Sequence, residues 1–121
     1  MTTMLRARLI VYQDGELLQE YPVGKEPINI GRAKDNDIRL SDEAISRHHL
    51  RVMRNHGEKY SVRDLASKNG TYLNNERIQE ERLKNGDRID LGRFSLLFSL
   101  TPKSASGTTT KTRSLNTSSG W

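Results

Sequence analysis

Apolar and polar residues alternate along most of the chain, and helical periodicity is almost absent. Leu5, Ala7, Leu9 and Val11 alternate with Arg6 and Arg8 in the first run, and between Phe94 and Leu100 the apolar residues are separated largely by serines. Alternation with a period of two residues is typical of strands with one buried face. Further short runs of this kind are ELLQEY, PINI, DIRL, HLRVMR, KYSVRD, TYL, RI and DRIDL. The pattern predicts an all-β protein.

Turn residues separate these predicted strands. Asp14-Gly15 lies between the first two runs and is a strong signal of a two-residue hairpin. The segment NHGE and the pairs Asn74-Asn75 and Asn85-Gly86 mark further turns. Many short strands with frequent turns are typical of two packed sheets. We therefore predict an antiparallel β-sandwich.

The composition changes at the end of the last predicted strand. From Pro102 to Trp121 the chain is rich in Ser, Thr and Gly and has two widely spaced apolar residues. Such a segment cannot bury enough apolar surface to offset the conformational entropy lost on folding. We expect one folded domain over residues 4–100, followed by a disordered tail over residues 101–121.

The net charge of +5 suggests a nucleic-acid partner until the charges are located along the chain. All 15 acidic residues and 17 of the 20 basic residues precede Thr101, so this part carries a net charge of +2. The other three basic residues lie in the tail. A mixed charge with a small excess is typical of an ordinary solvated surface. We expect no nucleic-acid partner.

The composition also indicates a cellular compartment. The chain has no cysteine, which is compatible with a reducing environment. Arginines interrupt the apolar residues near the amino terminus, unlike in a signal peptide. The sequence has no apolar run of the length that spans a membrane. We expect a cytoplasmic protein with no membrane partner, and we leave a nuclear location open.

The segment EAISRHHLRV raises the question of catalysis or metal binding. Ser46 close to two histidines suggests a nucleophile with its base, and His48, His49 and His56 suggest zinc. Adjacent residues of a strand point to opposite faces, and no cysteine or well-spaced carboxylate completes a tetrahedral zinc site. Ser46 also lacks the G-x-S-x-G context of a hydrolase. We expect no catalytic residue, no metal and no cofactor.

Three predicted loops instead carry hydrogen-bond donors that suit a tetrahedral anion. Loops of a sandwich gather at its two ends, and those separated by an even number of strands emerge at the same end. Two guanidinium groups, an ammonium group, a hydroxyl and an amide are suited to bind a phosphate. The residues are Arg32 in the first loop, Ser46 and Arg47 in the second, and Lys68 and Asn69 in the third.

Four motifs together resemble the forkhead-associated (FHA) domain family. They are IGR at 30–32, SRHH at 46–49, SKNGTYLN at 67–74 and LKNGDRIDLG at 83–92. The resemblance covers about residues 5–100, and the order and spacing of the motifs make it specific. It implies a sandwich of eleven strands that binds phosphothreonine-containing protein segments in Ser/Thr-kinase signalling. The alternative is a phosphate-independent protein-interaction domain with the same fold. A basic tail that binds nucleic acid ranks third.

The resemblance also implies roles for particular residues. It places Arg32 and Ser46 on the phosphate and Asn69 on the main chain of the peptide. Lys68 stands where the family often has Thr or Ser, and Arg47 stands where many members have Asn or another polar residue. Both remain candidates for phosphopeptide binding. The residues expected to support the loops are Gly31, His49, Gly70 and Thr71, with the glycines permitting the turns.

The tail contains a candidate phosphorylation site. Thr112 is followed three places later by Leu115, and members of the FHA family often read that position of a phosphothreonine peptide. We expect a monomer whose partner is a protein phosphorylated by a Ser/Thr kinase. Association through a phosphorylated tail is the alternative to this monomer.

Overall fold

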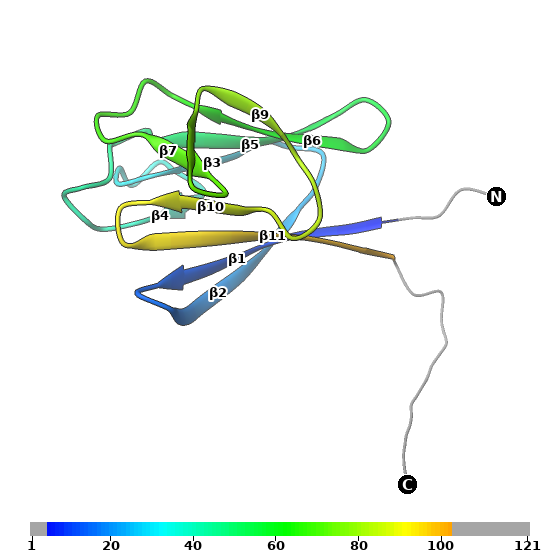
Figure 1. The fold of residues 1–121 in the computed structure, drawn as a ribbon, viewed down its shortest axis with the longest axis horizontal. Coiled ribbons are helices and arrows are strands. Elements are labelled where there is room, and N and C mark those ends of the chain that lie inside the picture. The colour runs from blue at the N-terminus through cyan, green and yellow to red at the C-terminus, as the bar shows by residue number, and fades with distance from the viewer. Residues whose placement is uncertain (1–4, 103–121) are drawn as a thin grey trace, which may run out of the picture.

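The computed structural model describes residues 5–102. These residues form strands and connecting loops, and no helix among them is long and apolar enough to cross a membrane. The predicted β-sandwich is confirmed (Figure 1). The strands are β1 (Leu5–Gln13), β2 (Glu16–Val23), β3 (Ile28–Gly31), β4 (Ile38–Arg39), β5 (Leu50–Asn55), β6 (Lys59–Asp64), β7 (Thr71–Leu73), β8 (Glu76–Ile78), β9 (Glu80–Leu83), β10 (Arg88–Leu91) and β11 (Phe94–Pro102).

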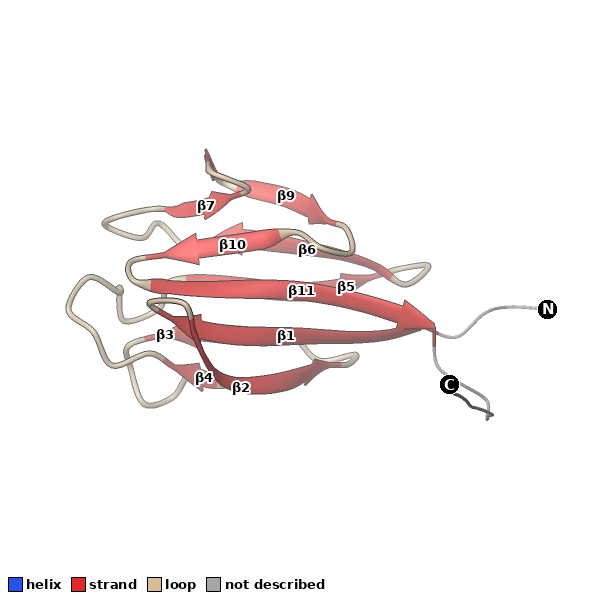
Figure 2. Cartoon of the chain, turned by 60° about the horizontal axis from the view of Figure 1, so that its bottom comes forward, coloured by secondary structure: helices blue, strands red, loops and turns tan. Residues whose placement is uncertain are grey.

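The strands form two sheets that pack face to face (Figures 1 and 2). The six-stranded sheet has the order β2-β1-β11-β10-β7-β8, and the five-stranded sheet has the order β4-β3-β5-β6-β9. The hairpin predicted at Asp14-Gly15 is present, and the turn predicted at Asn74-Asn75 also joins two paired strands; all four residues have positive φ angles. Such angles are required by the two-residue turns that match the twist of a hairpin.

The core lies between the two sheets and is supplied by the alternating apolar residues. Leu9 from one sheet and Ile30 and Val62 from the other are completely buried. The rings of Tyr60 on β6 and Phe98 on β11 meet across the layers, with their centroids 5.3 Å apart. Burial of these side chains is the main stabilising contribution to the fold.

The strand β9 was not predicted from the hydrophobic pattern. Its sequence is EERL, and only Leu83 reaches the core. It pairs with β6 at the edge of the five-stranded sheet. Charged residues are common on such edges because they discourage pairing with other chains. A strand with three exposed charged residues leaves no alternation to detect.

One strand pairing determines where the loops lie. β4 runs parallel to β3, with Ile30 beside Ile38, whereas the other paired strands are antiparallel. The chain leaves β3 through residues 32–37 (the β3–β4 loop) and then enters β4 in the same direction. Residues 40–49 (the β4–β5 loop) therefore begin at the same end of the sandwich.

The β6–β7 loop, residues 65–70, also lies at this end. β5 starts there, and β6 returns antiparallel to it. All three loops lie at the left in Figures 1 and 2. Leu5 and Pro102, the first and last described residues, pair with each other at the opposite end. The predicted tail lies outside the described residues from residue 103 onward and includes Thr112.

Candidate functional site

Hydrogen bonds to main-chain oxygens hold the β3–β4 loop against the β4–β5 loop. The amide of Arg32 donates to the carbonyl oxygen of Ser46 over 3.0 Å, and the amide of Ala33 donates to that of Arg47 over 3.1 Å. The side-chain amide of Asn36 donates to the carbonyl oxygens of Ala33 and Arg47 over 2.8 and 2.7 Å. The position of Ser46 and Arg47 is thus fixed by the neighbouring loop.

Gly31 permits the close approach of these two loops. A Cβ atom at this position would lie only 2.3 Å from the carbonyl oxygen of Arg47. Gly31 does not have a positive φ angle, so the tight turn inferred from the sequence is not the reason for a glycine. The reason is the absence of a side chain where another backbone passes.

Arg32 and Ser46 lie on adjacent, connected backbone segments. The Nε of Arg32 donates to the carbonyl oxygen of Ile45 over 3.0 Å. This bond orients the guanidinium group and uses only one of its nitrogens, so both Nη groups remain available as donors. The hydroxyl oxygen of Ser46 accepts a hydrogen bond from the amide of Lys68 over 2.9 Å. Its hydrogen is thereby free to point to a ligand.

Asp64 organises the β6–β7 loop and was not singled out from the sequence. Its carboxylate accepts hydrogen bonds from the amide and hydroxyl of Ser67 and from the hydroxyl of Thr71. The hydroxyl of Ser67 in turn accepts from the amide of Gly70. Burial acts to raise the pKa of Asp64, but these hydrogen bonds outweigh burial, and the pKa lies below its ordinary value. Asp is common before turns because its side chain can accept hydrogen bonds from nearby backbone amides.

His49 connects two of the loops from beneath and is completely buried. Its Nδ1 accepts a hydrogen bond from the amide of Ser46 over 3.1 Å. Because Nδ1 accepts, the ring proton is on Nε2, which donates to the carbonyl oxygen of Gly70 over 2.9 Å. Burial lowers the pKa of His49, although the Gly70 bond and the charge of Asp64 act to raise it. A neutral imidazole in one tautomer thus holds Ser46 next to the β6–β7 loop.

Lys68 and Asn69 form the exposed tip of the β6–β7 loop, and the buried Gly70 leads the chain back to β7. The side-chain amide of Asn69 donates to the carbonyl oxygen of Ala44 over 2.9 Å, which leaves the Asn69 Oδ1 as an acceptor. The side chain of Lys68 is exposed. Gly70 has a φ of 92°, and a Cβ there would lie 2.7 Å from the Nε of Arg77. Here both backbone conformation and space require glycine.

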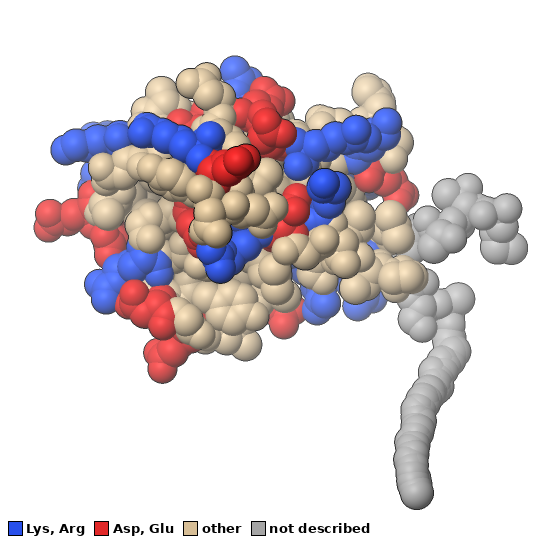
Figure 3. All heavy atoms as spheres, viewed as in Figure 1, with Lys and Arg blue, Asp and Glu red and all other residues tan. Residues whose placement is uncertain are grey.

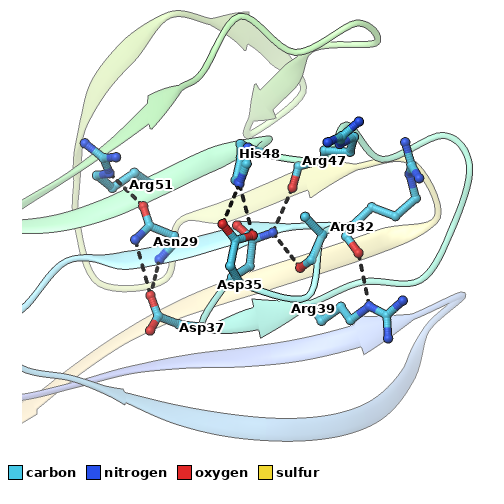
Figure 4. A network of polar contacts seen from close by, with 10 residues as sticks. Asn29, Arg32, Asp35, Asp37, Arg39, Arg47, His48 and Arg51 are labelled. Atoms are coloured by element: carbon cyan, nitrogen blue, oxygen red, sulfur yellow. Dashed lines mark hydrogen bonds and ion pairs between the residues drawn. The ribbon is translucent and has the colours of Figure 1, made fainter.

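Arg39 is a second residue that the sequence did not indicate. Its Nε donates to the carbonyl oxygen of Arg32 over 3.1 Å. In Figure 4 the guanidinium groups of Arg32, Arg39 and Arg47 lie on one side of the view, and Asp35 and Asp37 lie away from them. Alternation on β4 identifies Arg39 as solvent-facing, but it gives no reason to expect it beside Arg32.

His48 contacts the neighbouring loop through an exposed side chain. Its Nε2 lies 3.1 Å from a carboxylate oxygen of Asp35 and links the β4–β5 loop to the β3–β4 loop. It points away from the buried ring of His49, as adjacent residues do in extended chain. Within residues 5–102, no three His, Cys, Asp or Glu residues are grouped so that they could hold a metal ion.

The three loops therefore bring the predicted ligand-binding residues to one end of the sandwich. They are Arg32, Ser46, Arg47, Lys68 and Asn69, and the supporting residues beneath and between them are Gly31, His49, Gly70 and Thr71. The arrangement offers several hydrogen-bond donors and cationic groups on an exposed surface. Such a surface is suited to a multiply charged anion.

Known proteins with similar sequence and structure define the class of this sandwich. The family model of the FHA domain matches residues 28–92, which is more than half of the chain. The matched segment contains the three loops and all of the residues just named. The chain belongs to the FHA domain family.

Two curated relatives and one solved structure illustrate this relationship. The oxoglutarate dehydrogenase inhibitor of Corynebacterium jeikeium (strain K411) is 39% identical over 92 residues, which cover 76% of this chain and 63% of that protein. The glycogen accumulation regulator GarA of Mycolicibacterium smegmatis is 36% identical over 98 residues, covering 81% and 61%. The chain spans about three fifths of the length of these curated relatives.

The solved structure comes from a structural and functional analysis of phosphothreonine-dependent FHA domain interactions. It superposes with a TM-score of 0.69 at 33% sequence identity, and the match covers 78% of this chain and 95% of the other. The likeness therefore extends over almost the whole of that domain.

Proposed function

We propose that this FHA domain binds phosphothreonine-containing segments of other proteins and catalyses no reaction itself. One observation carries this proposal: Arg32 and Ser46 lie on backbone segments that are hydrogen-bonded to each other where three loops meet, and the hydrogen bonds of their side chains leave donors free. A phosphate ester presents about −1.5 to −2 charges at pH 7 and three strong acceptor oxygens. The two Nη groups of Arg32, the Ser46 hydroxyl and the exposed ammonium group of Lys68, whose amide contacts Ser46, match these requirements.

The rigidity of the site supports the same function. Three hydrogen-bonded residues fix the loops before any ligand arrives. Hydrogen bonds from Asn36 and His49 join neighbouring loops, and those to Asp64 hold the β6–β7 loop itself. A pre-organised surface spends little conformational entropy on binding. Asn69 then offers its Oδ1 to an amide of the peptide main chain, which would fix the direction of an extended ligand.

The charge distribution supports a peptide ligand rather than nucleic acid. Figure 3 shows Lys and Arg interspersed with Asp and Glu over the visible face, without a continuous basic stripe. A nucleic-acid surface ordinarily gathers its cations along the path of the phosphate backbone. The cations that are grouped here lie around a short stretch of three loops, which fits a single phosphorylated residue and its neighbours.

The partner in this proposal is a protein phosphorylated by a Ser/Thr kinase, and the domain acts as a cytoplasmic monomer. The two curated relatives are named as an inhibitor and a regulator, which supports control of other proteins by binding. Thr112 is the candidate phosphorylation site of the chain itself.

The deciding experiment is a titration of the full chain with a degenerate phosphothreonine peptide library. Its phosphoserine and unphosphorylated counterparts serve as controls. We expect saturable binding of the phosphothreonine library and none of the unphosphorylated one at the same concentrations. Equal binding of all three libraries would instead establish the phosphate-independent interaction domain. Strongly salt-dependent binding of DNA, without a preference among the peptides, would point to nucleic acid.

A further inference from the structure

An open groove lies at the end of the sandwich opposite the three loops. Its volume of about 640 Å³ is in the range of ligand-binding pockets. The groove forms because β2 stops at Val23, which pairs with Ala7, whereas β1 begins at Leu5 and pairs with β11 over its whole length. Figure 2 shows β1 and β11 continuing past the end of β2. Among the described residues, Leu5 and Arg6 therefore have a neighbouring strand on one side only.

The floor of the groove is apolar. Ala7 and Val23 line it from the six-stranded sheet, and Tyr60 lines it from the five-stranded sheet. Leu5 lies on the same core-facing side of β1 as Ala7, because alternate residues of a strand share a face, but it is only partly buried. An apolar side chain that enters the groove would contact these residues, and its burial would favour binding.

The rim of the groove contains two arginines on the outer face of β1. Arg6 is exposed and forms no ion pair within residues 5–102. The Nη1 of Arg8 donates to a carboxylate oxygen of Glu20 over 2.8 Å. The Nε of Arg8 is buried and has no hydrogen-bond partner in the described part of the chain. A buried donor without a partner costs free energy, so a ligand oxygen beside Arg8 would be stabilising.

The carboxylates that line the groove are already paired. Glu20 is bound by Arg8, and Glu58 lies 3.5 Å from the Nη2 of Arg54. An adjoining groove shares Glu58 and Tyr60 with the first, and its other charged residues are Lys59, Glu81, Arg82 and Lys84. Cations therefore exceed carboxylates along both grooves, and this charge favours an acidic partner.

The ends of the chain itself do not match this charge. Residues 1–4 and 103–121 contain no Asp or Glu, and the second segment contains three basic residues. An occupant with carboxylate side chains must therefore come from another protein.

We propose that the groove binds an extended acidic segment of a partner protein, in which one apolar residue lies between acidic residues. This segment pairs with the unpaired edge of Leu5 and Arg6 and continues the sheet beyond β2. Successive side chains of a strand point to opposite faces. The apolar side chain of the segment therefore meets the floor at Leu5 and Tyr60. Its acidic neighbours meet the outer face of β1 at Arg6 and Arg8. The site needs no phosphate and does not rest on the proposed function.

The first experiment titrates the full chain with three unphosphorylated peptides of equal length. The first peptide has a Leu between two Asp residues in neutral flanks, the second replaces this Leu by Ser, and the third replaces both Asp by Asn. Asp on both sides makes the result independent of strand direction. We expect the Ser peptide to bind about fivefold more weakly or worse, because a buried apolar side chain is lost. The Asn peptide should bind about three- to tenfold more weakly at low salt.

The second experiment locates the peptide on the molecule. In an NMR titration of the isotopically labelled full chain, the amides of Leu5 and Arg6 should shift, and those of Arg32 and Ser46 should not. Arg6→Gln should weaken binding of the acidic peptide about threefold. Arg77→Gln removes the same charge from β8, at the other edge of the six-stranded sheet, and should leave the affinity unchanged. Thermal unfolding of both variants verifies the fold.

Three outcomes would overturn the acidic-peptide groove. They are equal affinity of the three peptides, equal effects of Arg6→Gln and Arg77→Gln, and shifts at Arg32 and Ser46 in place of Leu5 and Arg6. The last outcome would mean that the acidic peptide binds at the loops. None of the three changes the preference for phosphothreonine peptides over unphosphorylated ones, so the proposed function is tested separately and can stand without the groove.

Discussion

At the scale of single residues, Arg32 combines a fixed position with free donors. Its Nε is held by the carbonyl oxygen of Ile45, and its amide by that of Ser46. The fork that we propose binds the phosphate is therefore oriented before binding, so little entropy should be lost when it meets the ligand. Lys68 differs because only its backbone is held, by the Ser46 hydroxyl, and its ammonium group is on a flexible exposed stem.

We predict that Arg32→Ala causes the larger loss of phosphopeptide affinity. Truncating one partner of a hydrogen-bonded charge pair typically costs about 2–5 kcal/mol, which corresponds to at least ~30-fold in affinity. Lys68→Ala should cost less, and most of its effect should disappear at high salt because it acts as a screened point charge. Calorimetric titration at two salt concentrations measures both. Less than a ~fivefold loss for a folded Arg32→Ala variant would contradict the assignment of Arg32 to the phosphate.

Gly31 gives a residue-scale test that does not depend on any ligand. In Gly31→Ala the new methyl group meets the carbonyl oxygen of Arg47 at 2.3 Å, and backbone must move. Forcing extra atoms into a packed site typically costs about 1–3 kcal/mol. Gly24→Ala is the matched control, since a Cβ there has no atom within 4 Å. Denaturant unfolding should show a clear loss of stability for Gly31→Ala only. Equal midpoints for the two variants would rule out the proposed backbone contact.

The residue types of the site could be read from the sequence only in part. Arg32, Ser46, Lys68 and Asn69 stand in loops with a recognisable order, and all come to the same end of the sandwich. The position of Arg39 beside Arg32 could not be found this way, because it comes from strand pairing next to Gly31 and not from any local motif.

At the scale of elements, strands with one buried face were predictable, whereas two other features were not. Edge strand β9 buries one residue and therefore has no periodic pattern. The parallel pairing of β4 with β3 depends on a six-residue loop that reverses the chain twice. The alternation of apolar and polar residues does not show strand direction, so this pairing could not be predicted from it. That pairing places two successive loops at the same end, so the site depends on the feature that is hardest to predict.

The connection between loops through His49 predicts a pH dependence of stability. Burial holds the pKa of His49 below the ordinary value of 6.5, so the unfolded chain binds a proton at this residue more readily than the folded domain. Stability from this source is therefore complete above about pH 6.5 and declines as the pH falls below it. The lowered pKa of Asp64 has a separate effect, which begins only below its ordinary value of 3.8.

His49→Gln tests this prediction because glutamine does not titrate and retains both a donor and an acceptor. Chemical unfolding at pH 7.5 and pH 5 should show a smaller loss of stability on acidification for the variant than for the native chain. His48 and His56 are present in both proteins, so the two measurements differ only in residue 49. Identical pH profiles of the native chain and a folded His49→Gln variant would exclude His49 as the cause.

At the scale of the whole molecule, the two ends of the sandwich have different roles. The loop end contains the proposed binding surface, and Leu5 and Pro102 lie at the other end (Figure 2). The nine residues of β11 connect these ends, a length of about 30 Å at the usual rise of a strand. Any ligand attached to the chain after Pro102 must cover this distance to reach Arg32.

This geometry predicts how a phosphorylated Thr112 would bind. The ten residues from Pro102 to Thr112 span at most about 35 Å, and about 16–19 Å on average as a flexible coil. Binding within one chain would require almost full extension, so we expect the phosphorylated tail to bind the loops of a second molecule. Sedimentation of the full chain carrying phosphate on Thr112 should show association that increases with concentration and disappears with Arg32→Ala. The unphosphorylated chain should sediment as a monomer throughout. A synthetic Thr108–Trp121 peptide phosphorylated at Thr112 gives the Kd of the tail for the domain. If the phosphorylated chain remains a monomer at concentrations well above this Kd, association between molecules is contradicted. If the peptide does not bind, the tail is excluded as a ligand altogether.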